Sequence, residues 1–344
     1  MKKILLFAFC FLLSLNVFSQ EKNFHPLQIN FGFPLSTINV KKAKEYTNAF
    51  SINLLVGISK NERSLALAGI SNVIANNATG LQIASVSNYI GNAGYGIEVA
   101  GVTNINKGSY NGIQVSGVYN YSGSGNGIAV AGVANMSKDS FIGLQLSGVT
   151  NIAGDVKGLQ FAAVANIAKK VKGVQFAALL NIAEESNFPI AFINIIKNGK
   201  MGVALSYDIL NNTILSFRSG GKYTYGILGV GYNNLVNDGS KIVAEAGYGI
   251  HIPINDWIEI NNEFKATSVG FSDDKTCCNF SYLLAPSFTF KNHYNVFGGA
   301  SFNYLNTNYV NSNDLMPNNY FWSKDGNYNQ RMYIGYQIGL QYVF

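Results

Sequence analysis

The chain has 344 residues, among them 36 Gly, 20 Tyr and 23 Phe, and only 12% of its residues are charged. Soluble domains usually carry about twice that share of charge. The formal net charge is +6, but the basic residues are scattered, with Lys41-Lys42 and Lys169-Lys170 as the densest points. This excludes the clustered basic surface of a nucleic-acid-binding protein.

The first twenty residues have the pattern of a secretory signal peptide. Lys2 and Lys3 precede an apolar run at residues 4–15, and a short polar segment at residues 16–20 follows. The pattern predicts a signal peptide over residues 1–20. The run is too short to span a membrane as a helix, and no later stretch approaches the roughly 20 apolar residues that a spanning helix needs. We therefore expect an exported protein without a helical anchor.

A sequence motif recurs eight times between residues 64 and 183, with one of its clearest copies at residues 158–166. Successive copies are 15 or 16 residues apart. Such a repeat is too short for a pair of helices, and its Gly, Asn and β-branched residues favour strands. The eight closing asparagines are Asn72, Asn88, Asn104, Asn120, Asn135, Asn151, Asn166 and Asn181.

Each copy alternates between two kinds of side chain. In residues 142–152, Leu144 and Leu146 point one way, while Gln145 and Asn151 point the other. This period of two predicts a strand with one apolar and one polar face. We expect the amides to pair with one another and stabilise the wall, because buried amides need partners. The alternative is an amide-lined lumen that binds a sugar or a peptide. The candidate amides are Gln82, Asn88, Asn104, Gln114, Asn120, Asn135, Gln145, Asn151, Gln160, Asn166, Gln175 and Asn181.

Two all-β folds fit these strands. Eleven residues are close to what a tilted strand needs to cross a bilayer, about 9–11. Short polar turns between the copies favour antiparallel hairpins, which would place Asn88 beside Glu98. In a β-solenoid each copy would instead form one coil, with stacked Gln and Asn ladders. A straight strand of eleven residues argues against that fold, because five more residues cannot return the chain to its start.

The sequence therefore predicts an antiparallel transmembrane β-barrel of about 16–18 strands over residues 21–344. This barrel would comprise N-terminal strands at 21–63, repeat strands at 64–195 and further barrel strands at 196–344. The alternative is a β-solenoid over residues 64–195 joined to an 8-stranded barrel. In both folds strands continue to the end of the chain, for example at residues 280–290.

The last segment, residues 331–344, alternates apolar and small or polar residues and includes Tyr342 and Phe344. It resembles the closing strand of bacterial outer-membrane β-barrels, whose terminal aromatic is read by the barrel assembly machinery. The resemblance implies outer-membrane lipid and that machinery as partners. The repeat block, roughly residues 60–200, resembles uncharacterised surface-repeat proteins of Gram-negative bacteria built on Gly-x-Gln-x-Ala-Gly-x-x-Asn units. That second resemblance implies no activity.

No catalytic or metal-binding motif stands out in the chain. His25, His251 and His293 have no carboxylate or second histidine at a suitable spacing, so rim or turn positions are expected for them. Adjacent cysteines such as Cys277 and Cys278 rarely form an unstrained disulfide. We expect this pair to lie in an exposed loop. We expect no enzyme activity, no cofactor and no metal.

The predicted function follows from these features. We expect a protein of the cell outer membrane that acts as a passive, porin-like channel or as a structural wall. The alternative is a surface-exposed repeat protein for binding or adhesion, whose ligand the sequence does not identify. Its binding loops would lie chiefly at residues 306–330, a segment rich in Asn and Tyr.

Overall fold

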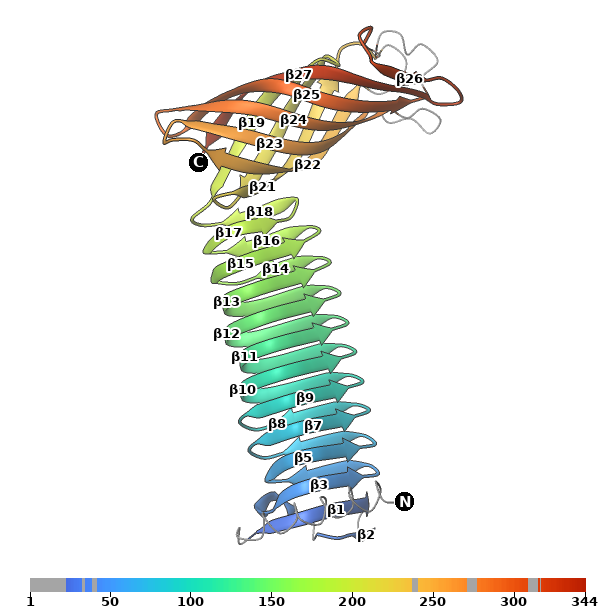
Figure 1. Ribbon diagram of the computed structural model, residues 1–344, viewed down its shortest axis with the longest axis vertical. Coiled ribbons are helices and arrows are strands. Elements are labelled where there is room, and N and C mark those ends of the chain that lie inside the picture. The colour runs from blue at the N-terminus through green and yellow to red at the C-terminus, as the bar shows by residue number, and fades with distance from the viewer. Residues whose placement is uncertain are drawn as a thin grey trace, which may run out of the picture. The chain divides into compact units, whose positions relative to one another are not determined.

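The computed structural model describes residues 23–32, 35–38, 42–236, 241–270, 277–308, 315 and 317–344 (Figure 1). The predicted signal peptide at residues 1–20 lies outside this part. The chain divides into two compact units, one up to Ala163 and one from Val164. Among the described residues, no helix is long and apolar enough to cross a membrane.

The first unit is a β-solenoid. From β3 onward its strands pair in parallel, and the offset equals the repeat, so Asn104 pairs with Asn120 and Asn120 with Asn135. Each repeat therefore forms one coil (Figure 1). Its elements are β1 (Phe24–Gly32), β2 (Leu35–Ser36), the 3-10 turn η1 (Ala43–Glu45), β3 (Thr47–Asn53), β4 (Val56–Ser59), β5 (Asn61–Ala68), β6 (Ser71–Ile74), β7 (Ala78–Ala84), β8 (Ser87–Ile90), β9 (Gly94–Ala100), β10 (Thr103–Ser116), β11 (Tyr119–Ala131), β12 (Ala134–Ser147) and β13 (Thr150–Ala162).

A bend in the middle of each repeat makes the coil possible. β10 ends at Ser116 and β11 begins at Tyr119, so the chain turns at Gly117 and Val118. A Cβ atom on Gly117 would lie 2.1 Å from the carbonyl oxygen of Gly101 in the preceding coil. Small residues let the backbones stack this closely at the corner, and Ser85, Ala163 and Ala178 take the place of glycine in other coils. The alternation of apolar and polar residues continues through the corner. The sequence pattern therefore does not indicate that the chain bends there.

A second glycine is needed where each coil begins again. Gly112 has φ = 140°, a conformation that strongly favours glycine. A Cβ atom there would lie 1.9 Å from the carbonyl oxygen of Gly96. These two glycine positions let each repeat form a coil, and β10 continues through the second bend with a register shift between Asn106 and Ser109.

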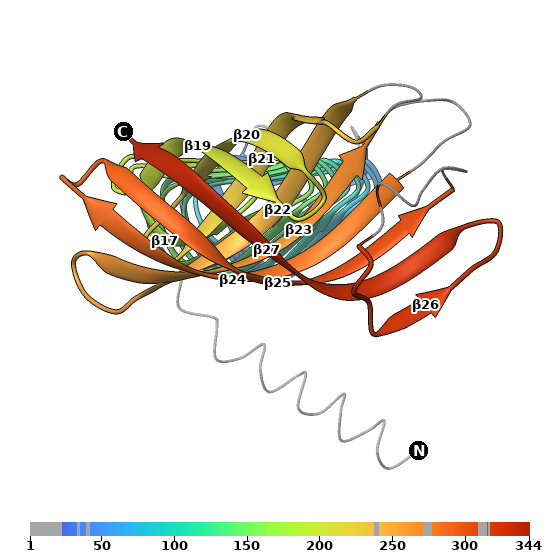
Figure 2. The same cartoon turned by 90° about the horizontal axis from the view of Figure 1, so that it is seen from above.

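The second unit opens with coil strands that pair in parallel in the same way, for example Asn181 with Asn194. They are followed by an antiparallel barrel, in which β27 closes the sheet against β19 and Leu340 pairs with Leu205 (Figure 2). The coil strands are β14 (Ala165–Ile167), β15 (Lys170–Ala177), β16 (Leu180–Ala183), β17 (Glu185–Ile190) and β18 (Ile193–Ile196). The barrel strands are β19 (Lys200–Asp208), β20 (Asn212–Gly220), β21 (Thr224–Asn233), β22 (Ile242–Pro253), β23 (Ile258–Val269), β24 (Cys277–Phe290), β25 (Tyr294–Thr307) and β27 (Asn329–Val343), and the short β26 (Trp322–Lys324) pairs with β27 outside the ring.

The predicted all-β class and the antiparallel barrel are confirmed, and the architecture is the one given as the alternative. Eight strands close the barrel in the described part of the chain, instead of 16–18. The number differs because the repeat strands stack in parallel coils and do not enter the barrel. Asn88 accordingly pairs with Asn72 and Asn104, and not with Glu98 as hairpins would require. The single barrel over residues 21–344 is thereby replaced by a solenoid followed by a barrel that begins at Lys200.

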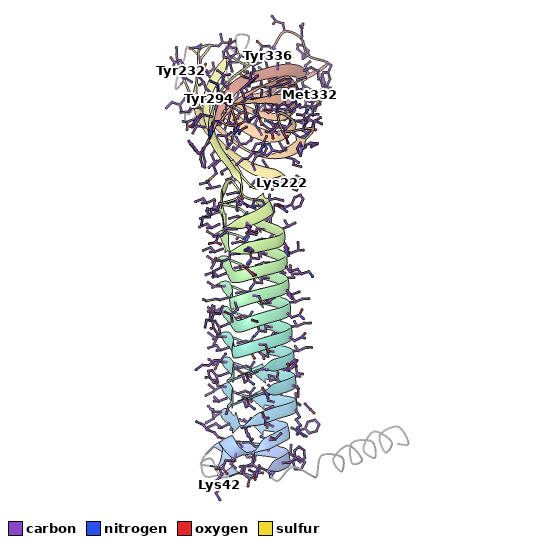
Figure 3. All side chains as sticks on the ribbon, turned by 90° about the vertical axis from the view of Figure 1, so that its left-hand side faces the viewer. Lys42, Lys222, Tyr232, Tyr294, Met332 and Tyr336 are labelled. Atoms are coloured by element: carbon purple, nitrogen blue, oxygen red, sulfur yellow. The ribbon has the colours of Figure 1, made fainter. Side chains whose placement is uncertain are left out.

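The barrel has an apolar outer wall and a polar interior. In β27, Ile338 and Leu340 are exposed by 56% and 61%, whereas Gln337 and Gln341 on either side of them are buried. Tyr232, Tyr294 and Tyr336 project from the wall and are also exposed (Figure 3). This is the polarity of a barrel that meets lipid on its outside.

The two rims of the barrel differ in their connections. On one rim the turns at residues 221–223, 254–257 and 291–293 are short. On the other rim the turn at residues 209–211 is short, but the stretches of chain between β21 and β22 and between β25 and β27 are longer. We call the first the short-turn rim and the second the long-loop rim.

The last coil strands of the second unit contact the short-turn rim. Thr224 donates a hydrogen bond to the carbonyl oxygen of Pro189 at 2.7 Å, and the amide of Tyr223 donates to Asn187 at 3.2 Å. The ring of Tyr223 stacks on Phe188, with ring centroids 5.0 Å apart. This end of the coil stack is therefore fixed to the barrel.

Candidate functional site

A ladder of asparagines runs through the interior of the coils. The side-chain amide of Asn104 donates to the Oδ1 atom of Asn120, and Asn120 donates in turn to Asn135, both at 2.9 Å. Asn120 also donates to the carbonyl oxygen of Val130 at 2.8 Å. Because the same residue occupies the same place in each coil, every amide finds partners in its neighbours. The ladder thus satisfies polar groups that water does not reach.

The predicted amide positions all lie inside the coils, with side chains no more than 1% exposed. The Gln positions form a second interior column, in which Gln160 donates to Gln145 at 2.8 Å. No lumen separates these side chains within the described coils, so their geometry is that of a packed core. The positions are Gln82, Asn88, Asn104, Gln114, Asn120, Asn135, Gln145, Asn151, Gln160, Asn166, Gln175 and Asn181.

A carboxyl group interrupts the glutamine column. Glu98 occupies the place that Gln82 and Gln114 hold in the neighbouring coils, and its side chain is fully buried. It accepts hydrogen bonds from Asn106 at 2.7 Å and from Gln114 at 3.0 Å. Burial disfavours the charged form and raises the pKa of Glu98 to about 7.

This buried carboxyl makes the stability of the coils depend on pH. Its pKa is higher in the folded protein, about 7, than the ordinary 4.5 of the unfolded chain. The folded state therefore binds the proton more tightly, and this stabilisation is complete below pH 4.5 and lost as the pH rises through 7. We expect the loss to be about 3 kcal/mol between pH 4 and pH 8. Glu98→Gln should remove this share and raise the unfolding temperature at pH 8, while buried Glu62, whose pKa burial also raises to about 7, keeps its own share of the pH dependence.

Thermal unfolding of the coils, followed by circular dichroism at several pH values, measures this effect. Glu184→Gln, at an exposed carboxyl of another coil, is the matched control and should keep the wild-type pH dependence. A Glu98→Gln protein with an unchanged pH profile would contradict the assignment.

The barrel interior holds a network of buried charges. Arg218 on β20 pairs with Glu263 on β23 at 2.8 Å, and Lys265 pairs with Glu245 at 3.1 Å and with Glu263 at 3.5 Å. The Tyr225 hydroxyl donates to Glu263 at 2.7 Å. All five side chains are buried. Because each charge has an opposite partner, the network fills the interior without an uncompensated ion.

A second cluster lies toward the short-turn rim. The Nδ1 atom of His251 is 2.9 Å from the Asn261 oxygen and 3.5 Å from Glu259. Its ring stacks on Tyr225, with centroids 4.1 Å apart. Glu259 also pairs with Lys200 at 2.6 Å. The side chains of this cluster occupy the barrel interior next to the charge network.

Apolar side chains pack the interior toward the long-loop rim. Tyr333 on β27 and Ile214 on β20 are fully buried there, and Leu315 from the long connection is 4% exposed. The interior of an eight-stranded barrel is narrow enough for its own side chains to fill it, or for one small ligand. In the described residues, buried side chains occupy this interior at the charge network, at the His251 cluster and toward the long-loop rim. The cluster consists of Leu210, Ile214, Val236, Val243, Val269, Cys277, Leu305, Leu315 and Tyr333.

Several side chains of the candidate site were not predicted from the sequence. β23 carries Glu259, Asn261, Glu263 and Lys265 at every second position, with Phe264 among the outward residues between them. This polar alternation was the available signal for a charged interior. It was missed because the segment has too few apolar residues to stand out as a strand.

Three expectations about single residues are corrected by the structure. His25 was expected at a rim or a turn, but it lies on β1 of the solenoid. His251 was expected at a rim or a turn, but it lies on β22 with its side chain in the barrel interior, beside Glu259. Cys277 was expected in an exposed loop, but it begins β24 and is buried, while Cys278 is half-buried and both thiols are free. His293 does lie in a turn. Among the described residues, no group of three or more His, Cys, Asp or Glu is placed to hold a metal.

The terminal aromatics lie at the short-turn rim. Tyr342 packs against His293 and Tyr294, with ring centroids 5.9 Å and 5.4 Å apart. The amide of Phe344 donates to the carbonyl oxygen of Met201 at 2.8 Å, and its side chain is 66% exposed. The last strand thus closes the barrel and leaves its final aromatic ring accessible.

In comparisons with known proteins, no family model, no curated protein and no solved structure matches this chain.

Proposed function

We propose that this protein is an outer-membrane β-barrel that acts as a structural wall and as the membrane anchor of its β-solenoid, and not as a channel. The observation that carries the proposal is the filled barrel interior. The ion pairs of Arg218 with Glu263 and of Lys265 with Glu245 occupy the space that a conducting pore would need.

The outer wall supports a membrane location. Outward side chains of the barrel strands, such as Leu205, Phe280 and Leu340, are apolar and exposed by 53–61%. All backbone groups of a closed barrel can pair within the sheet, as a bilayer requires. In this proposal Phe344 and Tyr342 present the terminal aromatic segment to the barrel assembly machinery, and lipid covers the wall.

The rims support an orientation. Bacterial outer-membrane barrels have short periplasmic turns and longer extracellular loops. The coils contact the short-turn rim through Thr224 and Tyr223. By this rule the coils of the second unit lie on the periplasmic side, and the long connection that includes residues 317–328 faces outward.

A second candidate function belongs to that long connection. Tyr320, Phe321 and Trp322 are exposed by 47%, 58% and 40%. Exposed aromatic residues beyond the membrane wall favour binding of a surface ligand. Adhesion therefore remains a candidate function, and in this case the long connection, not the repeats, would bind the ligand.

Planar-bilayer recordings of the purified full-length protein test the anchor proposal. We expect no stepwise current, because the interior is filled. Migration on a detergent gel before and after boiling provides the control that the barrel is closed, since a closed barrel runs more compactly until it is boiled. Reproducible current steps from heat-modifiable protein would show that the interior opens and would overturn the proposal.

A further inference from the structure

The outer surface of the first solenoid unit is apolar, although its interior is polar. On one face, two outward positions in each coil carry only aliphatic residues or phenylalanine. Ile113 and Val115 are exposed by 38% and 37%, and Leu159 and Phe161 each by 49%. The two rows are Leu65, Leu81, Ile97, Ile113, Ile128, Leu144, Leu159 and Leu67, Ile83, Val99, Val115, Val130, Leu146, Phe161.

The apolar surface continues around the corner of the coils. The corner row consists of one branched aliphatic residue per coil, such as Val102 and Val118, each exposed by 41%. On the opposite face, the outward row through Ile105 and Tyr121 is apolar, but the row next to the corner carries hydroxyl groups at Ser71, Ser87, Thr103 and Thr150. Three contiguous sides of the coil stack therefore carry apolar rows, and hydroxyl groups interrupt one of them. The corner row is Ile70, Val86, Val102, Val118, Val133 and Val149.

Charged residues outside the core gather on the fourth side, the edge opposite the corner. Residues 46–163 contain nine charged side chains, and two of them, Glu62 and Glu98, are buried inside the coils. The other seven comprise five basic and two acidic residues, which gives this edge a net charge of +3. They are Lys60, Arg63, Lys107, Lys138, Asp139, Asp155 and Lys157.

This distribution is the inverse of a water-soluble protein. A soluble monomer rarely exposes an apolar patch larger than a few hundred Å². Here the polar amides are inside, where Asn104 and Asn120 bond to one another, and the backbone groups pair between coils. A fold with its polar groups satisfied internally and apolar side chains outside is suited to hydrocarbon.

The dimensions of a coil favour a single leaflet. About five residues separate the edge near Gly112 from the corner at Gly117 and Val118. At about 3.3 Å per residue the apolar face is about 16 Å deep. One leaflet of a bilayer contributes about half of a hydrocarbon core of about 30 Å. The apolar faces therefore match the depth of one leaflet and are too short to span both.

We infer that the three apolar sides of the first solenoid unit are immersed in one leaflet of a phospholipid membrane, with the basic edge at anionic headgroups. A second copy of the chain is the competing occupant. Packed face to face, it would cover only one of the three sides, whereas acyl chains cover all of them. The basic edge also has a complement in anionic headgroups but none in an identical basic edge. The inference goes beyond the anchor function and does not depend on it.

Depth-dependent fluorescence quenching tests this inference in the full-length protein. An environment-sensitive fluorophore is attached to a single cysteine in a background without native cysteines, and the protein is refolded into vesicles of phosphatidylcholine and phosphatidylglycerol. The positions are Ile113→Cys on the face, Val118→Cys at the corner and Asn126→Cys at the exposed edge. Leu205→Cys on the barrel wall reports barrel insertion.

We expect lipids with brominated acyl chains to quench the labels at Ile113, Val118 and Leu205 several-fold more than the label at Asn126. Quenching at Leu205 without quenching at Ile113 and Val118 would overturn the inference and leave the barrel proposal standing. An absence of quenching at all four positions would overturn both. If the label at Ile113 is shielded from water but is not quenched by brominated chains, a second copy of the protein covers this face. Equal quenching in phosphatidylcholine alone would overturn the role of the basic edge.

Discussion

Arg218→Met is expected to destabilise the barrel by about 3–5 kcal/mol, because it leaves the buried Glu263 carboxylate without its closest opposite charge. The guanidinium of Arg218 also lies over the ring of Phe297, 4.2 Å from its centroid. Methionine keeps a long side chain over that ring, so the change isolates the charge. Urea unfolding in detergent or vesicles, followed by tryptophan fluorescence and by heat-modifiable migration, measures the loss.

The double variant Arg218→Met, Glu263→Gln provides the control. It removes both charges of the pair, so it should regain a large part of the stability lost in the single variant. Lys265 would then keep Glu245 as its partner. If the double variant is no more stable than Arg218→Met, the effect of Arg218 is due to packing and not to the ion pair.

Asn120→Leu is expected to destabilise the solenoid by about 3–5 kcal/mol, because three buried groups lose a partner and each such loss costs about 1–3 kcal/mol. The groups are the side-chain amide of Asn104, the Oδ1 atom of Asn135 and the carbonyl oxygen of Val130. Leucine has a similar size, so little volume changes. Urea unfolding of the full chain, followed by circular dichroism, measures the effect.

Asn126→Leu is the matched control, because Asn126 lies on the same strand, β11, at the exposed edge of the coil. A change there should stay within about 0.5 kcal/mol, as for most surface substitutions. Equal destabilisation by the two variants would mean that the Asn120 ladder contributes no more than a surface residue.

The sequence predicted which side chains face which way, but not how the strands pair. The alternation in residues 142–152 placed Gln145 and Asn151 on one face, and the structure buries both of them. Parallel coils and antiparallel hairpins share this alternation. What distinguishes them is the bend at Gly117 and Val118, where the period of two continues through a turn. A repeat pattern alone therefore does not distinguish a parallel solenoid from an antiparallel barrel.

The barrel was predictable where its strands are aromatic and less so where they are polar. Residues 280–290 were recognised as a strand, and they fall within β24. The inward charged residues of β23 were not predicted, because they contrast little with their neighbours. The pairing of Arg218 with Glu263 joins residues 45 positions apart, and no local pattern indicates it.

The asparagine ladder ends on the barrel. Asn181 donates to Asn194, and Asn194 donates to the carbonyl oxygen of Ser219 at 3.1 Å, while its own backbone amide donates to the Ser219 hydroxyl. The barrel strand therefore caps the last coil, where an open edge would otherwise recruit another chain. Each coil bonds only to its neighbours. Whole repeats of 15 or 16 residues can therefore be gained or lost in evolution while this junction stays the same.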